Sequence, residues 1–383
     1  MSAAAALKVA IVLPVKEGFA AGRIGAIGTI VHRLATSPAD GARPAIVQAV
    51  IGPPLSDPPL PGAAYHACAK SWWPPFSDNL RYAAGVARLI RSLQPALVEV
   101  HNRVDVGLAV ARACPATPVV LILHNDPQQM RQARTPAQRG RLLRTLARVV
   151  CVSDYIRGRL MEGVDAPLSD PPLAMINAVD FATLPPPSEE REKLILFAGR
   201  VVPEKGTDTF VAACAAALPH LPGWRAEVIG ADQFHAGSRI TAFVRQVHER
   251  AGPVGMRGYL PHDAVMEAMT RAAIVVLPSR WQDPCPLVAL EAMACGAALI
   301  TTRRGGLPEI GGDAALYVEP DDPVALARAI VALAQDPPRL AAVRHACRQR
   351  VRQFNLPDYA AQWNALRRGL VARRDTAMQV ASA

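Results

Sequence analysis

The fold class can be inferred from one run of residues, Trp281-Gln282-Asp283-Pro284-Cys285-Pro286-Leu287-Val288-Ala289-Leu290-Glu291-Ala292-Met293-Ala294-Cys295-Gly296. The apolar residues before it, from Ile274 to Leu277, predict a buried strand that ends at Pro278. A helix follows, in which Pro286 suits the first position and Gly296 suits the position just past the end. This order of strand, polar loop and helix is typical of an α/β fold.

The start of this helix is a candidate site for an anionic ligand. It opens at the carboxyl end of a strand, so its free N–H groups and the positive end of its dipole face whatever binds there. Asp283 precedes the helix and Glu291 lies inside it, so the two carboxylates could bracket one ligand. The same spacing also fits a capped strand–loop–helix unit with two solvated acids.

Length and composition are typical of a soluble globular protein. The chain has 383 residues, of which 51% are hydrophobic, and this predicts a large core and two domains. Its net charge of +10 favours an anionic partner, which could be a nucleotide, nucleic acid or an acidic membrane surface. The 7 cysteines contain no CxxC pair, which favours a reducing cytosol over a disulfide framework or a zinc site. No apolar run reaches the roughly 18 residues that a membrane span needs.

The N-terminal half alternates between predicted strands and helices. A strand at 9–13 precedes a Gly-rich loop at 14–25 and a helix at 26–35, and further strands are expected at 45–50, 96–100, 119–123 and 149–152. The loop lacks GxGxxG directly after the strand, which argues against a dinucleotide fingerprint. Trp72 and Trp73, in a Pro-rich segment, could line an acceptor site or simply pack against a domain edge.

The charged, Pro-rich segment 185–192 is predicted to be a linker, after which the alternation of strands and helices restarts. The predicted domains are 1–186, 187–356 and a C-terminal helix at 357–383 that packs back on the first domain. Arg200 and Lys205 flank a tight turn after the strand at 194–197, where they are well placed for a diphosphate. Scattered surface charges could produce the same pair.

Two histidines are candidates for substrate contact. His101 and His124 each follow a predicted strand, and strand ends carry ligands in open parallel sheets. A lone His is also common as a structural hydrogen-bonding residue. No metal site is predicted, because no partner His or carboxylate recurs at helical intervals.

The segment 131–159 is rich in arginine and has Asp154 as its single acid. Leucines interleave the cations, so a helix here would be amphipathic and basic and could dock on anionic lipid or on an anionic acceptor. A solvated Arg-rich helix fits equally well. Nucleic acid is not favoured as a partner, because no aromatic ladder accompanies the charge.

Together these elements resemble the family 4 retaining glycosyltransferases of the GT-B fold. The motifs that carry the resemblance are Gly199-Arg200, Glu204-Lys205-Gly206, Arg257-Gly258-Tyr259, Pro278-Ser279, residues 283–296, Gly305 to Ile310 and Tyr317-Val318. The resemblance is strong over 194–335. It is looser before that, where Gly25-Ala26, His124, Val152-Ser153 and Asn177 to Asp180 carry it. It implies two Rossmann-like, doubly wound domains facing a cleft, with the nucleotide sugar held mainly by the second.

The resemblance also implies roles for particular residues. Arg200 and Lys205 would hold the donor diphosphate, and Glu291 the ribose hydroxyls. Asp283 stands at a position near the donor sugar where the family commonly has Glu, whose side chain is one methylene longer. The amides of Leu287 and Val288 would donate to phosphate oxygens, and Tyr259 and Gly25 would also bind the donor. His124 would take part in catalysis together with Asp283, Arg200 and Lys205.

The implied function is hexosyl or N-acetylhexosaminyl transfer with retention, from a UDP-sugar or, second, a GDP-sugar. The acceptor would be a glycan or a lipid-linked molecule in lipopolysaccharide or exopolysaccharide synthesis. The enzyme would need no metal or cofactor. It would be cytoplasmic and could bind peripherally to the inner face of the cytoplasmic membrane. Two alternatives stay open. One is a nucleotide-sugar epimerase of the same architecture, and the other is a catalytically silent nucleotide-sugar-binding protein.

Overall fold

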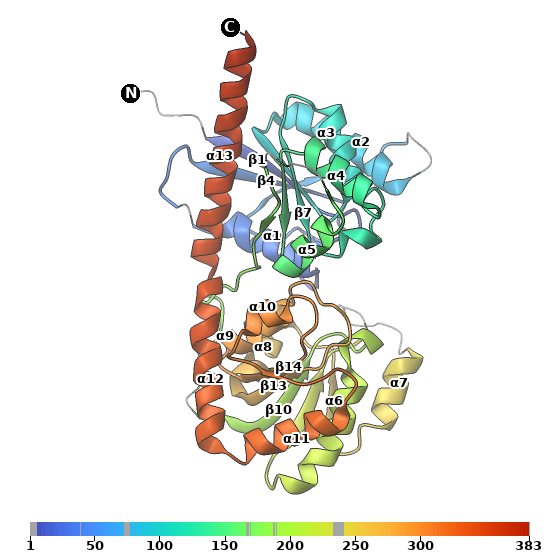
Figure 1. Cartoon of the computed structure of the whole chain (residues 1–383), viewed down its shortest axis with the longest axis vertical. Coiled ribbons are helices and arrows are strands. Elements are labelled where there is room, and N and C mark those ends of the chain that lie inside the picture. Colours follow the sequence, from blue (N-terminus) through green and yellow to red (C-terminus); the bar gives the residue numbers. More distant parts are fainter. Residues whose placement is uncertain are drawn as a thin grey trace. The chain divides into compact units, whose positions relative to one another are not determined.

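The computed structural model of the chain describes residues 6–38, 40–72, 77–165, 168, 170–186, 188, 190–232 and 241–382. The chain forms two compact units (Figure 1). The first runs to Asn177 and includes the C-terminal segment from Leu356, and the second is Ala178–Asn355. Each unit is built around a parallel sheet, so the predicted α/β class with two Rossmann-like domains is confirmed.

The first unit has a seven-stranded parallel sheet in the order β5-β4-β1-β6-β7-β8-β9. Its strands are β1 (Leu7–Val12), β4 (Ile46–Gly52), β5 (Ala64–Ala67), β6 (Leu97–His101), β7 (Val119–Leu123), β8 (Arg148–Cys151) and β9 (Leu173–Ala174). A separate hairpin joins β2 (Phe19–Ala20) to β3 (Arg23–Ile24). All residues of β6 and β7 are buried, because a parallel sheet is covered on both faces and its strands become continuous apolar runs.

The helices of this unit are α1 (Ala26–Thr36), α2 (Asp78–Leu93), α3 (Val104–Ala113), α4 (Pro136–Thr145), α5 (Asp154–Met161) and α13 (Leu356–Ser382). Their apolar residues recur at helical intervals, so each of these helices has one face that packs against the rest of the unit. On α2, for example, Tyr82, Val86 and Ile90 are buried at intervals of four residues and form one apolar face.

The second unit has a six-stranded parallel sheet in the order β12-β11-β10-β13-β14-β15. Its strands are β10 (Glu192–Ala198), β11 (Arg225–Ile229), β12 (Gly255–Gly258), β13 (Ala272–Leu277), β14 (Ala298–Thr301) and β15 (Leu316–Tyr317). Its helices are α6 (Thr207–Ala217), α7 (Ala242–Glu249), α8 (His262–Arg271), α9 (Leu287–Ala294), α10 (Leu307–Gly311), α11 (Pro323–Ala334) and α12 (Pro337–Val351).

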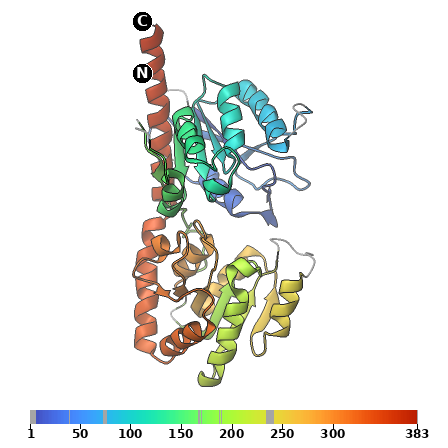
Figure 2. The ribbon, with the colours of Figure 1, turned by 45° about the vertical axis from the view of Figure 1, so that its right-hand side comes forward.

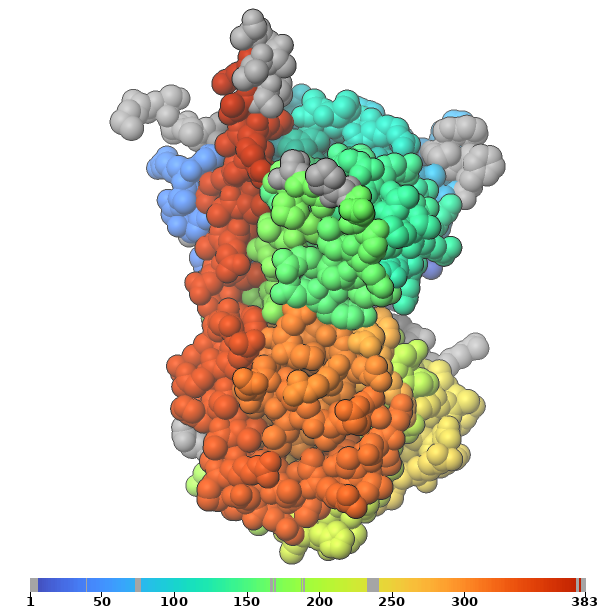
Figure 3. Space-filling view, in the orientation of Figure 1, coloured from blue at the N-terminus to red at the C-terminus, as the bar shows by residue number. Residues whose placement is uncertain are grey.

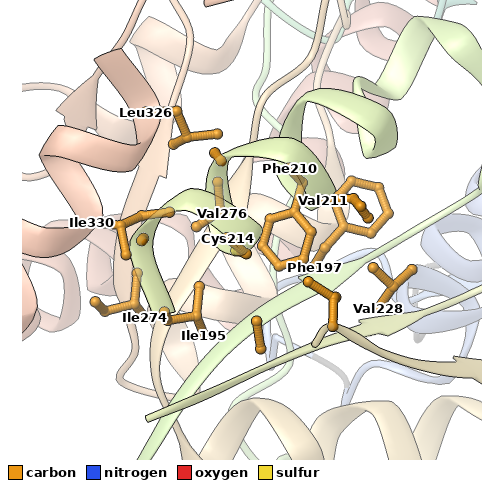
Figure 4. Close-up of a cluster of buried hydrophobic side chains, with 14 of the residues drawn as sticks. Ile195, Phe197, Phe210, Val211, Cys214, Val228, Ile274, Val276, Leu326 and Ile330 are labelled. Carbon is orange, nitrogen blue, oxygen red and sulfur yellow. The ribbon is translucent and has the colours of Figure 1, made fainter. Parts of the chain in front are cut away.

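A buried apolar cluster holds α6 and α11 against the second sheet (Figure 4). Phe197 of β10 meets Phe210 of α6 with ring centroids 5.7 Å apart, and Ile330 of α11 is fully buried in the same cluster. Burying such side chains stabilises each by about 1.5–3 kcal/mol relative to exposure. The packing fixes β10 and α6, and hence the loop between them.

The boundary between the units differs from the predicted boundary at 186. The structure places it after Asn177, so residues 178–186 belong to the second unit. Ala178 and Val179 are fully buried, and the Val179 amide donates to the Phe354 carbonyl at 2.9 Å. A Pro-rich composition therefore did not mean a free linker, because Val179 pairs with Phe354 and Asn355 just after α12. Pro187 and Glu189 of the predicted linker lie outside the described residues, as does Trp73.

The C-terminal helix α13 lies along the first unit (Figures 1, 2 and 3). Its Arg367 donates to both carboxylate oxygens of Glu99 on β6, from Nε at 2.7 Å and from Nη2 at 2.8 Å. The two side chains are 1% and 2% exposed, so the pair is buried. Trp363, one turn earlier, is also buried and packs edge-on against Tyr359. Apolar packing and one buried ion pair thus fix the helix. Among the described helices, none is long and apolar enough to cross a membrane.

Arg367→Ala should lower the free energy of unfolding by about 3–5 kcal/mol, because it leaves the Glu99 carboxylate buried without its cation. Arg373→Ala is the matched control on the same helix. It removes an exposed pair with Asp170 and should cost less than about 1 kcal/mol. Urea denaturation measures both losses, and equal small losses would mean that the buried pair contributes no more than a surface pair.

Candidate functional site

The predicted donor site lies where the strand order of the second sheet reverses. The chain runs from β10 outward to β11 and β12, then returns to β13 beside β10 and continues to β14 and β15. The loops after β10 and β13 therefore diverge, and in open parallel sheets ligands bind at the carboxyl ends of such strands. Arg200 and Lys205 follow β10, and the run from Asp283 to Glu291 follows β13.

These two loops are tied together through their backbones. The Glu204 carbonyl accepts hydrogen bonds from the amides of Arg280 at 3.0 Å and Trp281 at 3.1 Å. Gly206 has a φ of +70°, and a Cβ there would overlap the carbonyl oxygen of Pro278. A side chain at that position would push the loops apart, so glycine is required both by its dihedral angle and by the close approach.

Arg280 strengthens the same junction, and sequence reasoning missed it. Its Nη1 and Nη2 atoms donate to the two Asp208 oxygens at 2.7 and 2.8 Å, and Nη1 also donates to the Pro203 carbonyl at 2.7 Å. It also pairs with Asp321. A planar guanidinium suits this fork, since one group can satisfy several acceptors at fixed angles. Its place directly after Pro278-Ser279 was the only signal in the sequence.

The structure brings Lys205 and Asp283 together. The Lys205 ammonium forms an ion pair with the Asp283 carboxylate, and it lies 5.9 Å from the centre of the Trp281 ring. Asp283 is 6% exposed, so the pair is largely removed from water. A charge that is partly desolvated interacts more strongly with its partner and with any bound ligand than a surface charge does. Lys205 and Asp283, which the resemblance assigned separately to the diphosphate and to the sugar, thus form one ion pair.

Helix α9 begins at Leu287 with Pro286 as its N-cap, one position later than predicted. It ends at Ala294, and Gly296 has a φ of +82°, as its predicted place past the helix end requires. No side chain caps the first turn, where Leu287 and Val288 are half-buried. Glu291 lies inside α9 with its side chain 8% exposed, and its Oε1 is 3.8 Å from Nε2 of His262 on α8, a neighbour that sequence reasoning missed.

A third loop holds Asp283 from the other side. The Gly306 amide donates to the Asp283 carbonyl at 2.7 Å, and the Gly305 amide donates to Gln282 Oε1 at 2.6 Å. Gly305 has a φ of +58°, and a Cβ there would overlap the backbone of Asp283. The Gly305-Gly306 pair in the sequence therefore lets the loop after β14 approach Asp283 closely.

Two further predicted donor residues lie along the same edge of the sheet. Arg200 is the second residue after β10 and is half-buried. Tyr259 follows β12, at the carboxyl end of the outermost strand on that side, and is half-buried as well. Arg200 and Tyr259 thus lie on the same edge of the second sheet as the Lys205–Asp283 pair, and their part in donor binding stays a prediction.

In the first unit, Gly25 is the N-cap of α1, and the start of this helix is already occupied by a carboxylate. Oε1 of Glu17 accepts a hydrogen bond from the Gly28 amide at 2.9 Å, and a Cβ on Gly25 would overlap the same oxygen. Burial raises the pKa of Glu17, and the amides of Gly28 and Gly25 and the charge of Arg103 oppose that rise. An anion is therefore less suited to this helix start than the sequence alone suggested.

His101 and His124 meet at the carboxyl edge of the first sheet. His101 Nδ1 and His124 Nε2 lie 2.9 Å apart, a hydrogen-bonding distance, and the rings are stacked with centroids 5.1 Å apart. Burial lowers the pKa of His124 to about 3 and holds the pKa of His101 well below its usual value, so both rings are neutral near pH 7.

The Arg-rich segment comprises α4, β8 and α5, with β8 at the strand predicted at 149–152. Several of its arginines turn inward, so the basic face is smaller than the composition suggested. Arg139 is buried and donates to the Leu160 carbonyl at 2.8 Å, and Arg148 is buried and pairs with Asp170. The exposed arginines in and just before α4 are Arg131, Arg134, Arg141 and Arg144. Within the described ranges no group of three or more His, Cys, Asp or Glu side chains could hold a metal ion.

Two family models match the chain. Residues 192–336 match glycosyl transferases group 1, and residues 34–169 match glycosyltransferase family 4. Among curated proteins, the putative glycosyltransferase YtcC of Bacillus subtilis is 28% identical over 60% of this chain and 60% of its own length. The lipopolysaccharide core biosynthesis mannosyltransferase LpsB of Rhizobium meliloti is 30% identical over 52% of this chain and 57% of its own length. The chain thus spans less than two thirds of either relative.

Solved structures show the same fold at low sequence identity. Sucrose-phosphate synthase from Thermosynechococcus elongatus superposes with a TM-score of 0.76 at 20% identity, over 96% of this chain and 100% of that chain. Anabaena HepE in complex with UDP superposes with a TM-score of 0.71 at 16% identity, over 94% of this chain and 99% of that chain. Two separate parts of the chain thus match glycosyltransferase family models, and the chain has the GT-B fold of these solved structures.

Proposed function

We propose that this protein is a retaining glycosyltransferase that moves a hexose or N-acetylhexosamine from a nucleotide sugar to a glycan or lipid-linked acceptor. The observation that carries the proposal is the partly buried Lys205–Asp283 pair, which joins the loops after β10 and β13 at the strand-order reversal of the second sheet. A UDP-sugar is the favoured donor and a GDP-sugar is second. One of the solved neighbours, Anabaena HepE, is in complex with UDP-glucose, which supports the choice of nucleotide.

The chemistry requires a fixed positive environment. Breaking the bond between sugar and phosphate builds negative charge on the leaving diphosphate, and prearranged cations with a helix N-terminus stabilise that charge best. In this proposal Arg200, Lys205 and the first amides of α9, on Leu287 and Val288, bind the diphosphate. These groups supply the charge that leaving-group departure needs, so we propose no metal or cofactor.

The two acids have different roles in the proposal. Glu291, inside α9, would accept hydrogen bonds from the ribose hydroxyls. In the free protein, Asp283 pairs with the Lys205 ammonium. When the donor binds, Lys205 would contact the diphosphate, and the Asp283 carboxylate would then accept a hydrogen bond from the donor sugar. The Asp283 side chain is one methylene shorter than that of Glu. The Gly305-Gly306 loop fixes the backbone of Asp283, and this backbone position determines how far the carboxylate extends toward the donor sugar. Tyr259 and Gly25 complete the proposed donor site, and His124 would contact a sugar hydroxyl.

Lipopolysaccharide or exopolysaccharide synthesis is the proposed setting. Two relatives support it, the LpsB mannosyltransferase and the exopolysaccharide phosphotransferase SCO2592 of Streptomyces coelicolor, which is 32% identical over 51% of this chain and 21% of its own length. The proposed location is the cytoplasm, peripheral at the membrane, with the exposed arginines in and just before α4 facing anionic headgroups.

Lys205→Ala should lower kcat by about 100-fold or more, because it removes a cation from the leaving diphosphate. The assay incubates purified protein with UDP-, GDP- and ADP-sugars and scores transfer, hydrolysis, isomerisation and bound donor. Lys193→Ala, an exposed lysine on β10, is the control and should keep full activity. Thermal melting of both variants checks that they fold.

Each alternative gives a different result in the same assay. A free isomerised sugar without acceptor would identify an epimerase, and bound donor without turnover would identify a silent binding protein. Near-normal transfer by Lys205→Ala would remove Lys205 from the mechanism.

Flotation with anionic liposomes tests the membrane proposal. At low salt the protein should float with the vesicles, and changing Arg131, Arg134, Arg141 and Arg144 together to Gln should abolish this, since surface attraction is worth about 1 kcal/mol per cation. Arg328→Gln with Arg339→Gln, exposed cations of the second unit, is the control. If wild type stays at the bottom of the gradient at low salt, the membrane proposal is contradicted and the result favours a soluble acceptor.

A further inference from the structure

A hollow of about 500 Å³, part of it open to solvent, lies in the second unit at the C-terminal end of α9. One wall comes from the segment just after the unit boundary and contains Phe181, Leu184 and two prolines. The other wall contains Ala294 of α9 together with Arg348 and Arg352 at the end of α12. Among the described residues, no carboxylate lines this α9 hollow, so its walls are apolar and cationic.

The α9 hollow is separate from the candidate donor site. Ala294 is the last residue of α9, whereas the amides proposed to bind the diphosphate belong to Leu287 and Val288 in the first turn. At a rise of about 1.5 Å per residue, these two ends of the helix are about 10 Å apart. A ligand in the hollow would therefore contact the donor helix at the end away from the diphosphate.

Two other arginines already satisfy the C-terminal end of α9. Arg191 donates from Nη2 to the Cys295 carbonyl at 2.5 Å, and Arg344 of α12 donates from Nε to the Gly296 carbonyl at 3.1 Å. The C-terminal end of a helix carries a partial negative charge of about one half, and these two cations offset it. Arg348 is therefore not needed to cap α9.

Arg348 is a half-buried cation without a partner of its own. It lies four residues after Arg344, on the same face of α12, and its stem crosses Gly296, where a Cβ would be 3.2 Å from Arg348 Cδ. Within the part of the chain that the structure describes, its guanidinium makes no hydrogen bond and no ion pair. Because guanidinium groups withdrawn from water are normally paired, an anion that enters the hollow is well matched to Arg348.

Phe181 supplies the apolar part of the hollow. Its side chain is 38% exposed, although the turn that carries it is fixed by Asp180. Asp180 Oδ1 accepts from the Ala182 amide at 3.0 Å, and the Asp180 carbonyl accepts from Thr183 Oγ1 at 3.0 Å. This neighbouring carboxylate is thus engaged in its own turn, and a ligand that covers the Phe181 ring removes apolar surface from water.

We propose that the α9 hollow binds a small organic anion, a phosphate monoester or a carboxylate, whose charged group pairs with Arg348 and whose apolar body covers Phe181. Sites for small molecules typically combine apolar walls with a few charged groups that orient the ligand, as here. A guanidinium can form two parallel hydrogen bonds with either anionic group, and the exposed Arg352 adds a second cation beside it. The site does not depend on the proposed transferase function, because it shares no residue with the donor site.

Ligand-detected saturation-transfer nuclear magnetic resonance of the full chain tests the site with three probes that share one aromatic ring. Phenyl phosphate, benzoate or both should bind at least about fivefold more tightly than uncharged benzyl alcohol, because the anion pairs with a guanidinium. Arg348→Gln should raise the Kd of the tighter anion about tenfold, the size expected for hydrogen bonds to a charged group. The ratio of the two anion affinities shows whether phosphate or carboxylate is the preferred group.

Phe181→Ala tests the apolar wall, and it should raise the Kd of the same anion about fivefold, because less ring surface is covered. Arg339→Gln, at an exposed cation in the first turn of α12, is the matched control and should leave the Kd unchanged. Thermal melting of every variant checks that it folds.

Lys205→Ala separates the hollow from the candidate donor site, which could also attract phenyl phosphate. The account expects the same Kd in wild type and Lys205→Ala. Three results would overturn the proposal: binding lost in Lys205→Ala but kept in Arg348→Gln, benzyl alcohol bound as tightly as both anions, or no signal from either anion.

Discussion

The candidate site depends on the ion pair between Lys205 and Asp283. The two residues lie on loops that follow neighbouring strands, β10 and β13, and the Glu204 carbonyl and the absent side chain of Gly206 bring those loops together. Without this close approach, a lysine and an aspartate separated in sequence would be solvated charges worth little to each other. With it, they form a partly desolvated pair, which the proposed function places against the donor diphosphate.

In the first unit, polar side chains also lie at the carboxyl ends of a parallel sheet, but they differ in type from those of the second unit. Strand ends again gather polar side chains at one edge, and here they include a carboxylate at the start of α1 and a pair of neutral histidines. Arg367 of the C-terminal helix pairs with Glu99 beneath this edge, so a helix far along the chain contributes to the environment of His101. Neutral donors and acceptors suit hydroxyl groups, whereas the fixed cations of the second unit suit phosphate.

The sequence predicts the fold and the local structure of the donor loop well, because hydrophobic periodicity and the Pro and Gly signals are local. The strand before Pro278 and the end of α9 before Gly296 are where the pattern put them. Long-range partners could not be predicted. Arg280 with Asp208 and Glu99 with Arg367 join residues far apart in the chain, and nothing in their local sequence distinguishes them from surface charges. The unit boundary differs from the predicted one for the same reason, since composition marked a linker but the pairing of Val179 with residues 354 and 355, just after α12, fixes where the second unit begins.

The central claim is that Lys205 contacts the donor diphosphate, and calorimetric binding of UDP and uridine to the same protein tests it most directly. The account predicts that wild type binds UDP at least about tenfold more tightly than uridine, a difference of about 1.4 kcal/mol, and that Lys205→Ala removes most of this difference while its affinity for uridine is unchanged. An equal preference for UDP in wild type and Lys205→Ala would contradict the account.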